Sequence, residues 1–316
     1  MSVNSKVLVT GANGFVGRHL CRYLDSRGYP VVSAVRAKCT PIVGGNEVFS
    51  VGDVDGSTCW AAALADVSLI VHLANRAHVM GEQGLDGLAE FRRVNVDGSI
   101  NLARQAIAAG IKRFVYVSSI KVNGESTSAV PFSDDDKPNP QDAYALSKFE
   151  AECALQELFS GTACELLILR PPLIYGAGVK GNLVGLSKLV RAGIPLPFGL
   201  VKNRRSMLLV DNFCLMIEAA LSKALLNYSV YLVADRQCLS IGEVVGFFAT
   251  AMNKRVLLLP VPVRLLIAFG VCVGRKAEVE RLVGSLEVCS DRFYRDFSIE
   301  CNVSVEEGFR RMVDAQ

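Results

Sequence analysis

The feature that most constrains the fold is a glycine-rich segment near the N-terminus, Thr10-Gly11-Ala12-Asn13-Gly14-Phe15-Val16-Gly17. An apolar run precedes it and a helical pattern follows it, so the glycines fall at a strand-to-helix turn. Glycine there permits a tight turn and a close approach of backbone N–H groups to a pyrophosphate, which the helix N-terminus also favours. The segment therefore predicts a dinucleotide-binding turn made by Gly11, Asn13, Gly14, Phe15, Val16 and Gly17.

Short apolar runs alternate with longer helical patterns through the first half of the chain. Runs at 31–36, 69–73 and 114–118 are separated by helical patterns, among them Ser57 to Leu64 and a long one from Glu90 to Ala109. The runs are apolar on both faces, as strands covered by helices on both sides must be. We expect an α/β fold, a doubly wound parallel sheet of the Rossmann type with helices on both faces and a smaller C-terminal substrate-binding lobe.

The pattern changes after Arg170, where proline and glycine become frequent. We predict an NAD(P)-binding domain over residues 1–175 and a mainly substrate-binding lobe over 176–316. The chain is expected to return to the first domain near 205–235, with Ser206 to Asp211 as a strand.

The second predicted strand ends at Arg36, where an acidic residue would bind the ribose 2′-hydroxyl of NAD. Arginine can bind a 2′-phosphate instead, so NADP(H) is favoured and NAD(H) stays possible. The alternative is a solvated cation that stacks on adenine. Asp53 and Val54 follow the third predicted strand and are expected near the adenine.

Tyr144 and Lys148 lie four residues apart, on one face of a predicted helix. A cation close to a phenol favours the phenolate, so Tyr144 could exchange a proton with a sugar hydroxyl or ketone. Ser118 and Ser119 end the apolar strand 114–117, and carboxyl ends of parallel strands face the ligand crevice. The glycine-rich turn, the Tyr144–Lys148 pair and the serines at the strand end together predict an oxidoreductase site.

The segments TGANGFVG, SSIKVNG, YALSK and RPPLIYG together resemble the extended short-chain dehydrogenase/reductase family. The similarity is greatest to its branch of nucleotide-sugar 4-epimerases, dehydratases and reductases, and it covers nearly the whole chain. The resemblance implies that Tyr144 is the acid/base and that Lys148 lowers its pKa and binds the nicotinamide ribose. It implies that Ser119 binds the substrate oxygen, and that the chain forms a homodimer.

Further site residues follow from the same resemblance. It implies that the cofactor is lined by Leu73, Ala74, Asn95, Ser118 and Pro171. It implies that a UDP-sugar is held by Asn182 and Arg205 at the diphosphate and by Leu196, Pro197 and Phe198 at the uracil. Arg76 and His78 follow the cofactor-lining segment and could approach the sugar. Val122-Asn123-Gly124 departs from the VYG of many epimerases, which leaves the hexose open.

Two reactions fit these residues. One is NAD(P)H-dependent reduction of a UDP-4-keto-6-deoxy-N-acetylhexosamine in bacterial surface-polysaccharide (O-antigen) biosynthesis, which Arg36 favours. The other is 4-epimerisation of UDP-glucose or UDP-N-acetylglucosamine with tightly bound NAD. A non-catalytic NADP-binding protein is a third reading, but such proteins typically lose the tyrosine or the lysine.

Composition excludes several other classes. The 34 basic and 31 acidic residues give a net charge of +3, too small and evenly spread for a nucleic-acid partner. The ten cysteines show no metal-ligand spacing, so we expect no metal. The apolar stretch 256–274 is interrupted by Pro260, Pro262 and Arg264, which argues against a membrane span and leaves contact with a membrane surface open. Without a signal sequence at the start, we expect a cytoplasmic protein.

Overall fold

The computed structural model describes residues 5–37, 47–77, 85–223 and 228–316. Its centre is a seven-stranded sheet in the order β3-β2-β1-β4-β5-β6-β9, with every pair of neighbours parallel. The strands are β1 (Val7–Thr10), β2 (Val31–Val35), β3 (Glu47–Ser50), β4 (Leu69–His72), β5 (Arg113–Val117), β6 (Glu165–Arg170) and β9 (Tyr228–Leu232). The predicted Rossmann-type α/β fold is confirmed.

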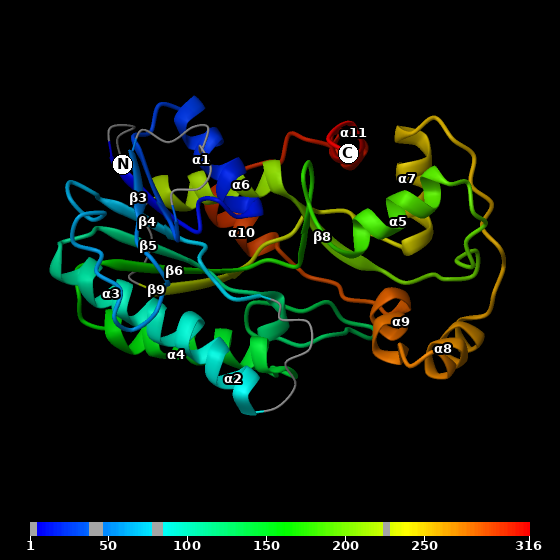
Figure 1. The fold of residues 1–316 in the computed structure, drawn as a ribbon, viewed down its shortest axis with the longest axis horizontal. Helices are drawn as coiled ribbons and strands as arrows, with labels where there is room; N and C mark the ends of the chain where they lie inside the picture. The colour runs from blue at the N-terminus through cyan, green and yellow to red at the C-terminus, as the bar shows by residue number, and fades with distance from the viewer. Residues whose placement is uncertain (1–4, 38–46, 78–84, 224–227) are drawn as a thin grey trace.

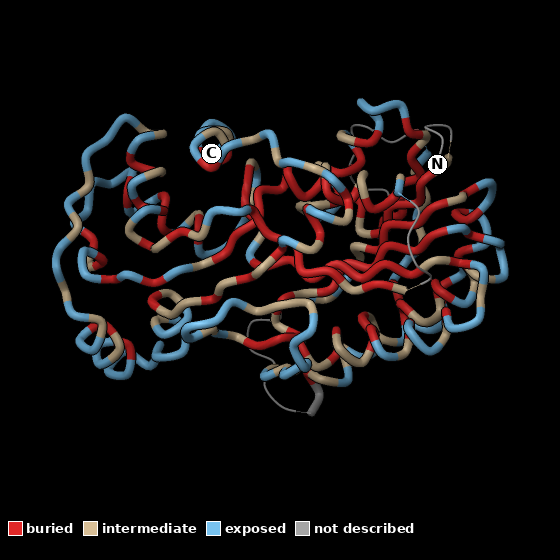
Figure 2. Tube along the Cα trace, turned by 180° about the vertical axis from the view of Figure 1, so that it is seen from behind, coloured by how far each residue is buried: buried red, intermediate tan, exposed pale blue. Residues whose placement is uncertain are grey.

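Helices cover both faces of this sheet (Figure 1). One face carries α1 (Phe15–Ser26), α6 (Val210–Ser222) and α10 (Asp291–Phe297); the other carries α2 (Leu85–Arg92), α3 (Gly98–Ala108) and α4 (Ala143–Phe159). Strand residues alternate between the two cores, since Val7 and Val9 pack in one and Leu8 in the other. Figure 2 shows the sheet as a continuous buried layer. The sheet is therefore a rigid frame for whatever lies at its carboxyl end.

A second sheet lies beside the first, in the order β10-β8-β7. It consists of β7 (Leu173–Tyr175), β8 (Arg205–Leu209) and β10 (Cys238–Leu239), and it shares a core with α5 (Asn182–Arg191), α7 (Ile241–Ala251) and α11 (Val305–Asp314). Two further helices, α8 (Val263–Cys272) and α9 (Lys276–Val283), lie at the far end of this part (Figure 1). The strand expected over 206–211 is β8, but it joins the small sheet, and β9 is the strand that returns to the large one. The division at residue 175 stays a prediction.

Two helix predictions were wrong in detail. Ser57 to Leu64 forms turns, because Asp55 accepts a hydrogen bond from the Ser57 N–H and so favours an Asx turn over a helix start. The long helix expected over 90–109 is divided by a π-helical turn, η1 (Arg93–Asp97), between α2 and α3. Ser99 Oγ donates to the carbonyl of Asn95 in that turn, at 2.7 Å. Among the residues described, no helix has both the length and the apolar character to cross a membrane.

Candidate active site

The glycine-rich turn connects β1 to α1, at the carboxyl end of the large sheet. Gly11 has a φ of +64°, and a Cβ there would lie 2.9 Å from the amide nitrogen of Ala74, so the turn approaches the end of β4 closely. A Cβ on Gly17 would overlap the carbonyl oxygen of Gly11. Gly14 caps α1 without a side-chain hydrogen bond, which leaves the first-turn N–H groups available to an anion.

The residues expected to hold a dinucleotide surround this turn. Leu73 and Ala74 directly follow β4, and Asn13 and Gly14 are exposed while Phe15 and Val16 are half-buried. Arg36, just after β2, and Asp53 are both exposed, and Val54 is buried against Gly98. Ser118 Oγ is buried without a hydrogen-bond partner in the described part of the chain. An uncapped helix start, a cradle that only glycine allows and an unsatisfied hydroxyl fit a nicotinamide dinucleotide.

Tyr144 lies in the first turn of α4, whose N-cap is Asp142. Burial raises the pKa of Tyr144 to about 12, a hydrogen bond with Ser119 lowers it, and the Asp142 carboxylate raises it. The Ser118 N–H donates to the Leu169 carbonyl and the Ile120 N–H to the Pro171 carbonyl. These bonds extend the β5–β6 pairing and hold Ser119 next to the segment of Pro171.

Lys148 is buried one helical turn beyond Tyr144. Its ammonium donates to the Val117 carbonyl at 2.7 Å and lies 4.1 Å from the centre of the Tyr116 ring. Burial lowers the pKa of Lys148 to about 7, against a smaller opposing effect from Glu152. The ammonium is thus directed to the strand carbonyl, and the expected effect of Lys148 on the pKa of Tyr144 stays a prediction.

A buried chain of hydrogen bonds that the sequence analysis missed supports the glycine-rich turn. Thr10 Oγ1 accepts from the N–H groups of Leu73 and Ala74, at 3.1 Å each, and lies 2.7 Å from Nδ1 of His72. His72 Nε2 lies 3.0 Å from Ser99 Oγ, which donates to the Asn95 carbonyl. The Thr10 hydroxyl therefore donates to Nδ1, and Nε2–H donates to Ser99. Burial lowers the pKa of His72 to about 3, so this imidazole is neutral.

Asn95 connects the loop after β4 to the helix of Tyr144. Its side-chain oxygen accepts from the Arg76 N–H at 2.8 Å, and its amide nitrogen donates to Ser147 Oγ at 3.0 Å. Ser147 in turn donates to the Tyr144 carbonyl. Asn95 is fully buried and touches the site through these neighbours. The one sequence signal for this role is the polar pair Asn95 and Ser99 within an otherwise apolar helical pattern.

Two ion-pair clusters fix the segment that follows Ser119. Lys121 Nζ contacts the carboxylates of Glu125 and Asp142, which joins this segment to the N-cap of α4. Arg170, at the end of β6, donates through Nε to Glu152 on α4 at 3.0 Å and through Nη1 to Asn123 at 2.9 Å. Neither cluster was predicted from the sequence, although Glu152 follows Lys148 at helical spacing.

The residues expected to hold the nucleotide lie in the part built on the small sheet. Asn182 is exposed at the first turn of α5, Leu196 and Phe198 are buried, and Pro197 is half-buried. Arg205 Nη1 donates to the carbonyls of Arg281 and Gly284 at the end of α9. Its role at a diphosphate stays a prediction. His78 lies outside the described residues.

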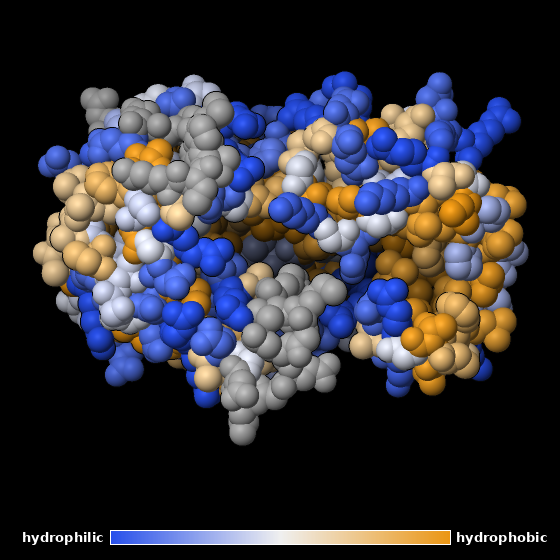
Figure 3. Space-filling model, in the orientation of Figure 1, coloured by the Kyte–Doolittle hydropathy of each residue, from blue (hydrophilic) through white to orange (hydrophobic). Residues whose placement is uncertain are grey.

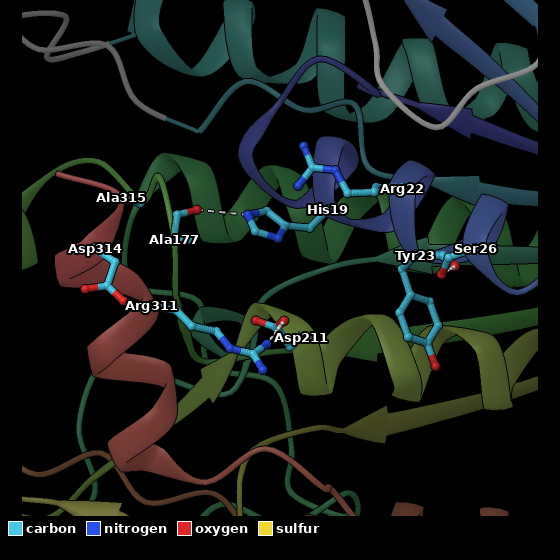
Figure 4. Close-up of a pocket in the computed structure, with 9 residues that line it drawn as sticks. All are labelled: His19, Arg22, Tyr23, Ser26, Ala177, Asp211, Arg311, Asp314 and Ala315. Atoms are coloured by element: carbon cyan, nitrogen blue, oxygen red, sulfur yellow. Dashed lines mark hydrogen bonds and ion pairs between the residues drawn. The ribbon is translucent and has the colours of Figure 1, made fainter.

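A separate surface groove lies where α1 faces α11 (Figure 4). His19 points to the Ala177 carbonyl, which it meets at 2.8 Å, and Arg311 points to Asp211, with which it forms an ion pair. None of the predicted site residues lines the groove. The groove is therefore not the candidate active site.

Comparisons with known proteins agree with this geometry. Residues 7–234 match the model of the NAD dependent epimerase/dehydratase family. A UDP-glucose 4-epimerase of Vibrio cholerae is 39% identical over 98% of this chain and 94% of its own. An N-acetyl-alpha-D-glucosaminyl-diphospho-ditrans,octacis-undecaprenol 4-epimerase of Escherichia coli O157:H7 is 27% identical over 85% of this chain and 79% of its own. The structure of MoeE5 in complex with UDP-glucose and NAD superposes with a TM-score of 0.78, at 22% identity, over 98% of both chains.

Proposed function

Because the chain belongs to the NAD dependent epimerase/dehydratase family, we propose that it is an oxidoreductase acting at the 4-position of a UDP-linked sugar. The observation that carries this proposal is the placement of three groups at the carboxyl end of the large sheet: Ser119 follows β5, and Tyr144 and Lys148 lie one turn apart on α4, where the Lys148 ammonium donates to the Val117 carbonyl at the end of β5. When the Tyr144 phenol and the Ser119 hydroxyl lie close together, both can form hydrogen bonds with the same substrate oxygen. The glycine-rich turn lies at the same edge of the sheet.

The proton chemistry follows from the pKa of Tyr144. At about 12 it keeps the phenol protonated at neutral pH, so Tyr144 can donate a proton to the oxygen of a ketone under reduction. Ser119 would orient the same oxygen through a hydrogen bond. Lys148 would hold the nicotinamide ribose, and its charge would stabilise the phenolate left behind. The nicotinamide, when bound, supplies or accepts the hydride.

The finer proposal is reduction of a UDP-4-keto-6-deoxy-N-acetylhexosamine with NADPH, in surface-polysaccharide biosynthesis. Arg36 supports it, because an exposed guanidinium at the end of β2 suits a 2′-phosphate and a reductase must exchange its cofactor at each turnover. The second candidate is 4-epimerisation with retained NAD, favoured by the Vibrio cholerae relative. In both, we expect Asn182 and Arg205 at the diphosphate, Leu196, Pro197 and Phe198 at the uracil, and Arg76 and His78 near the sugar.

The deciding experiment follows the oxidation of NADPH or NADH by absorbance with a UDP-4-keto-6-deoxy-N-acetylhexosamine. Stoichiometric oxidation supports the reductase. No oxidation, together with interconversion of UDP-glucose or UDP-N-acetylglucosamine with its galacto partner, overturns it in favour of the epimerase. Tyr144→Phe is the control for both reactions. Light scattering of the same preparation tests the expected homodimer.

A further inference from the structure

The end of the molecule formed by α8 and α9 carries exposed apolar side chains. On α8, Leu265 is 61% exposed and Phe269 is 66% exposed. The buried residues of this helix, Leu266 and Gly270, face inward, where a Cβ on Gly270 would meet Val279 of α9. Figure 3 shows hydrophobic surface gathered at this end. We call this set the α8 patch: Leu257, Leu265, Phe269, Val271 and Val273.

Cations border the α8 patch, and the segment that forms it has no carboxylate. From Asn253 to Ala277 the sequence has no aspartate or glutamate, and it has five exposed cations, Lys254, Arg255, Arg264, Arg275 and Lys276. Arg275 and Lys276 pair with Glu278 and Glu280 on their own helix. Within the described residues no ion pair involves Arg255 or Arg264. The patch is therefore apolar at its centre and positively charged at its edge.

From this combination we infer that the α8 patch docks the enzyme on a bilayer with anionic headgroups. A helix of ten residues is too short to span a membrane. A helix with an apolar outward face and flanking arginines can lie in the interfacial plane, with its apolar side chains at the acyl boundary and its cations at the phosphates. A second copy of the chain fits less well, because in a two-fold symmetric contact the same patch of both copies would meet, and the cations of one copy would face the cations of the other. This inference does not depend on the proposed reaction.

Docking at this end would also place the stretch predicted to hold the nucleotide, residues 196–198, near the membrane. The Leu196 N–H donates to the Leu257 carbonyl, and the Gly199 N–H donates to the Leu259 carbonyl, at 2.9 Å each. The segment that leads into α8 is thus bonded directly to residues 196–199. A docked enzyme would hold this side of its site close to the membrane surface, while the large sheet at the other end stays in water (Figure 1).

Vesicle flotation of the full chain tests the inference. We expect the protein to float with vesicles of phosphatidylcholine mixed with phosphatidylglycerol, and much less with phosphatidylcholine alone or at high salt. Phe269→Glu should lower the bound fraction about tenfold or more. The double variant R255Q/R264Q should lower it to a similar extent, at about fivefold for each cation. Matched controls are Val130→Glu, at a side chain 76% exposed outside the patch, and Arg104→Gln on α3.

The flotation and light-scattering results distinguish membrane docking from its alternatives. Loss of flotation confined to the patch variants, with enzyme turnover in the absence of vesicles unchanged, supports membrane docking. Absence of flotation of the unmodified protein, or an equal loss in the two controls, overturns it. A fall in molecular mass on Phe269→Glu, measured by light scattering without lipid, would also overturn it and make the patch a contact between two copies.

Discussion

The hydroxyl of Thr10 donates to Nδ1 of His72 across 2.7 Å, and this bond joins the end of β1 to the end of β4 beneath the glycine-rich turn. Thr10 also accepts from two N–H groups of the loop after β4. Both side chains are fully buried, so the loop that borders the dinucleotide turn depends on one hydroxyl. Substitution of either side chain should therefore change the stability of the fold.

Thr10→Val should destabilise the fold. It keeps the shape of the side chain but leaves Nδ1 of His72 and two N–H groups without a partner, at a cost of about 2–3 kcal/mol in the free energy of unfolding. Urea denaturation measures the loss. Thr162→Val is the control, since its hydroxyl donates to the carbonyls of Phe159 and Cys164 near the protein surface. Equal stabilities of Thr10→Val and the unmodified protein would contradict the role assigned to Thr10.

His72 should make the protein sensitive to acid. Its pKa is about 3 in the folded protein and near 6.5 in the unfolded chain, so between these values the unfolded state binds more protons. Stability is therefore lost as pH falls below about 6.5, by at most about 1.4 kcal/mol per pH unit from this group. His72→Gln should flatten the dependence of the free energy of unfolding on pH between about 4 and 6.5. His19→Gln controls for the loss of a histidine as such, and an unchanged slope in His72→Gln would refute the prediction.

Tyr144→Phe should abolish turnover without unfolding the protein. Loss of a positioned proton donor lowers kcat by about 10²–10⁴-fold, while the phenyl ring keeps its contact with Phe91. Dinucleotide affinity, measured by calorimetry, should change little. Tyr175→Phe is the matched control, because the Tyr175 hydroxyl is buried and has no hydrogen-bond partner within the described residues. Turnover of Tyr144→Phe within tenfold of the unmodified enzyme would place the acid elsewhere.

Much of the fold followed from local sequence patterns, whereas the connections within the site did not. The glycine-rich turn and the parallel strands were predictable because glycine spacing and hydrophobic periodicity are local signals. The pairs Thr10–His72, Asn95–Ser147 and Arg170–Glu152 join residues far apart in the chain, and no local pattern specifies them. The π-helical turn at Asn95 was also missed, because hydrophobic periodicity does not distinguish a π turn from an α turn.

The contributions of Arg170 and Glu152 to the free energy of unfolding should be strongly coupled. Both side chains are buried, and Arg170→Met would leave the Glu152 carboxylate buried without its partner, at a cost of about 3–5 kcal/mol. R170M/E152M should recover much of that stability, because it removes both charges from the interior. Urea denaturation of both single variants and the double variant measures the coupling. Additive losses would show that the two side chains act independently.

Asp142→Asn should shift the pH dependence of the reaction. The Asp142 carboxylate raises the pKa of Tyr144, and asparagine removes the charge while it still caps α4. The pKa of Tyr144 should therefore fall. In the direction of ketone reduction, which needs the protonated phenol, the alkaline limb of kcat/KM should move to lower pH. Ser304→Asn, which exchanges the N-cap of α11, is the control. A shift to higher pH would show that Asp142 acts on the phenol in another way.

Arg36→Ser should change the affinity for NADPH much more than the affinity for NADH. If the guanidinium binds a 2′-phosphate, its removal costs a charge-assisted hydrogen bond and weakens NADPH about tenfold to hundredfold, while NADH affinity stays nearly the same. Calorimetric titration with each cofactor measures the ratio, and Arg104→Ser on α3 controls for the loss of one surface charge. If Arg36 instead stacks on adenine, both cofactors weaken equally, because adenine is common to them. An equal loss would remove the observation that favours the reductase and leave the epimerase as the better proposal.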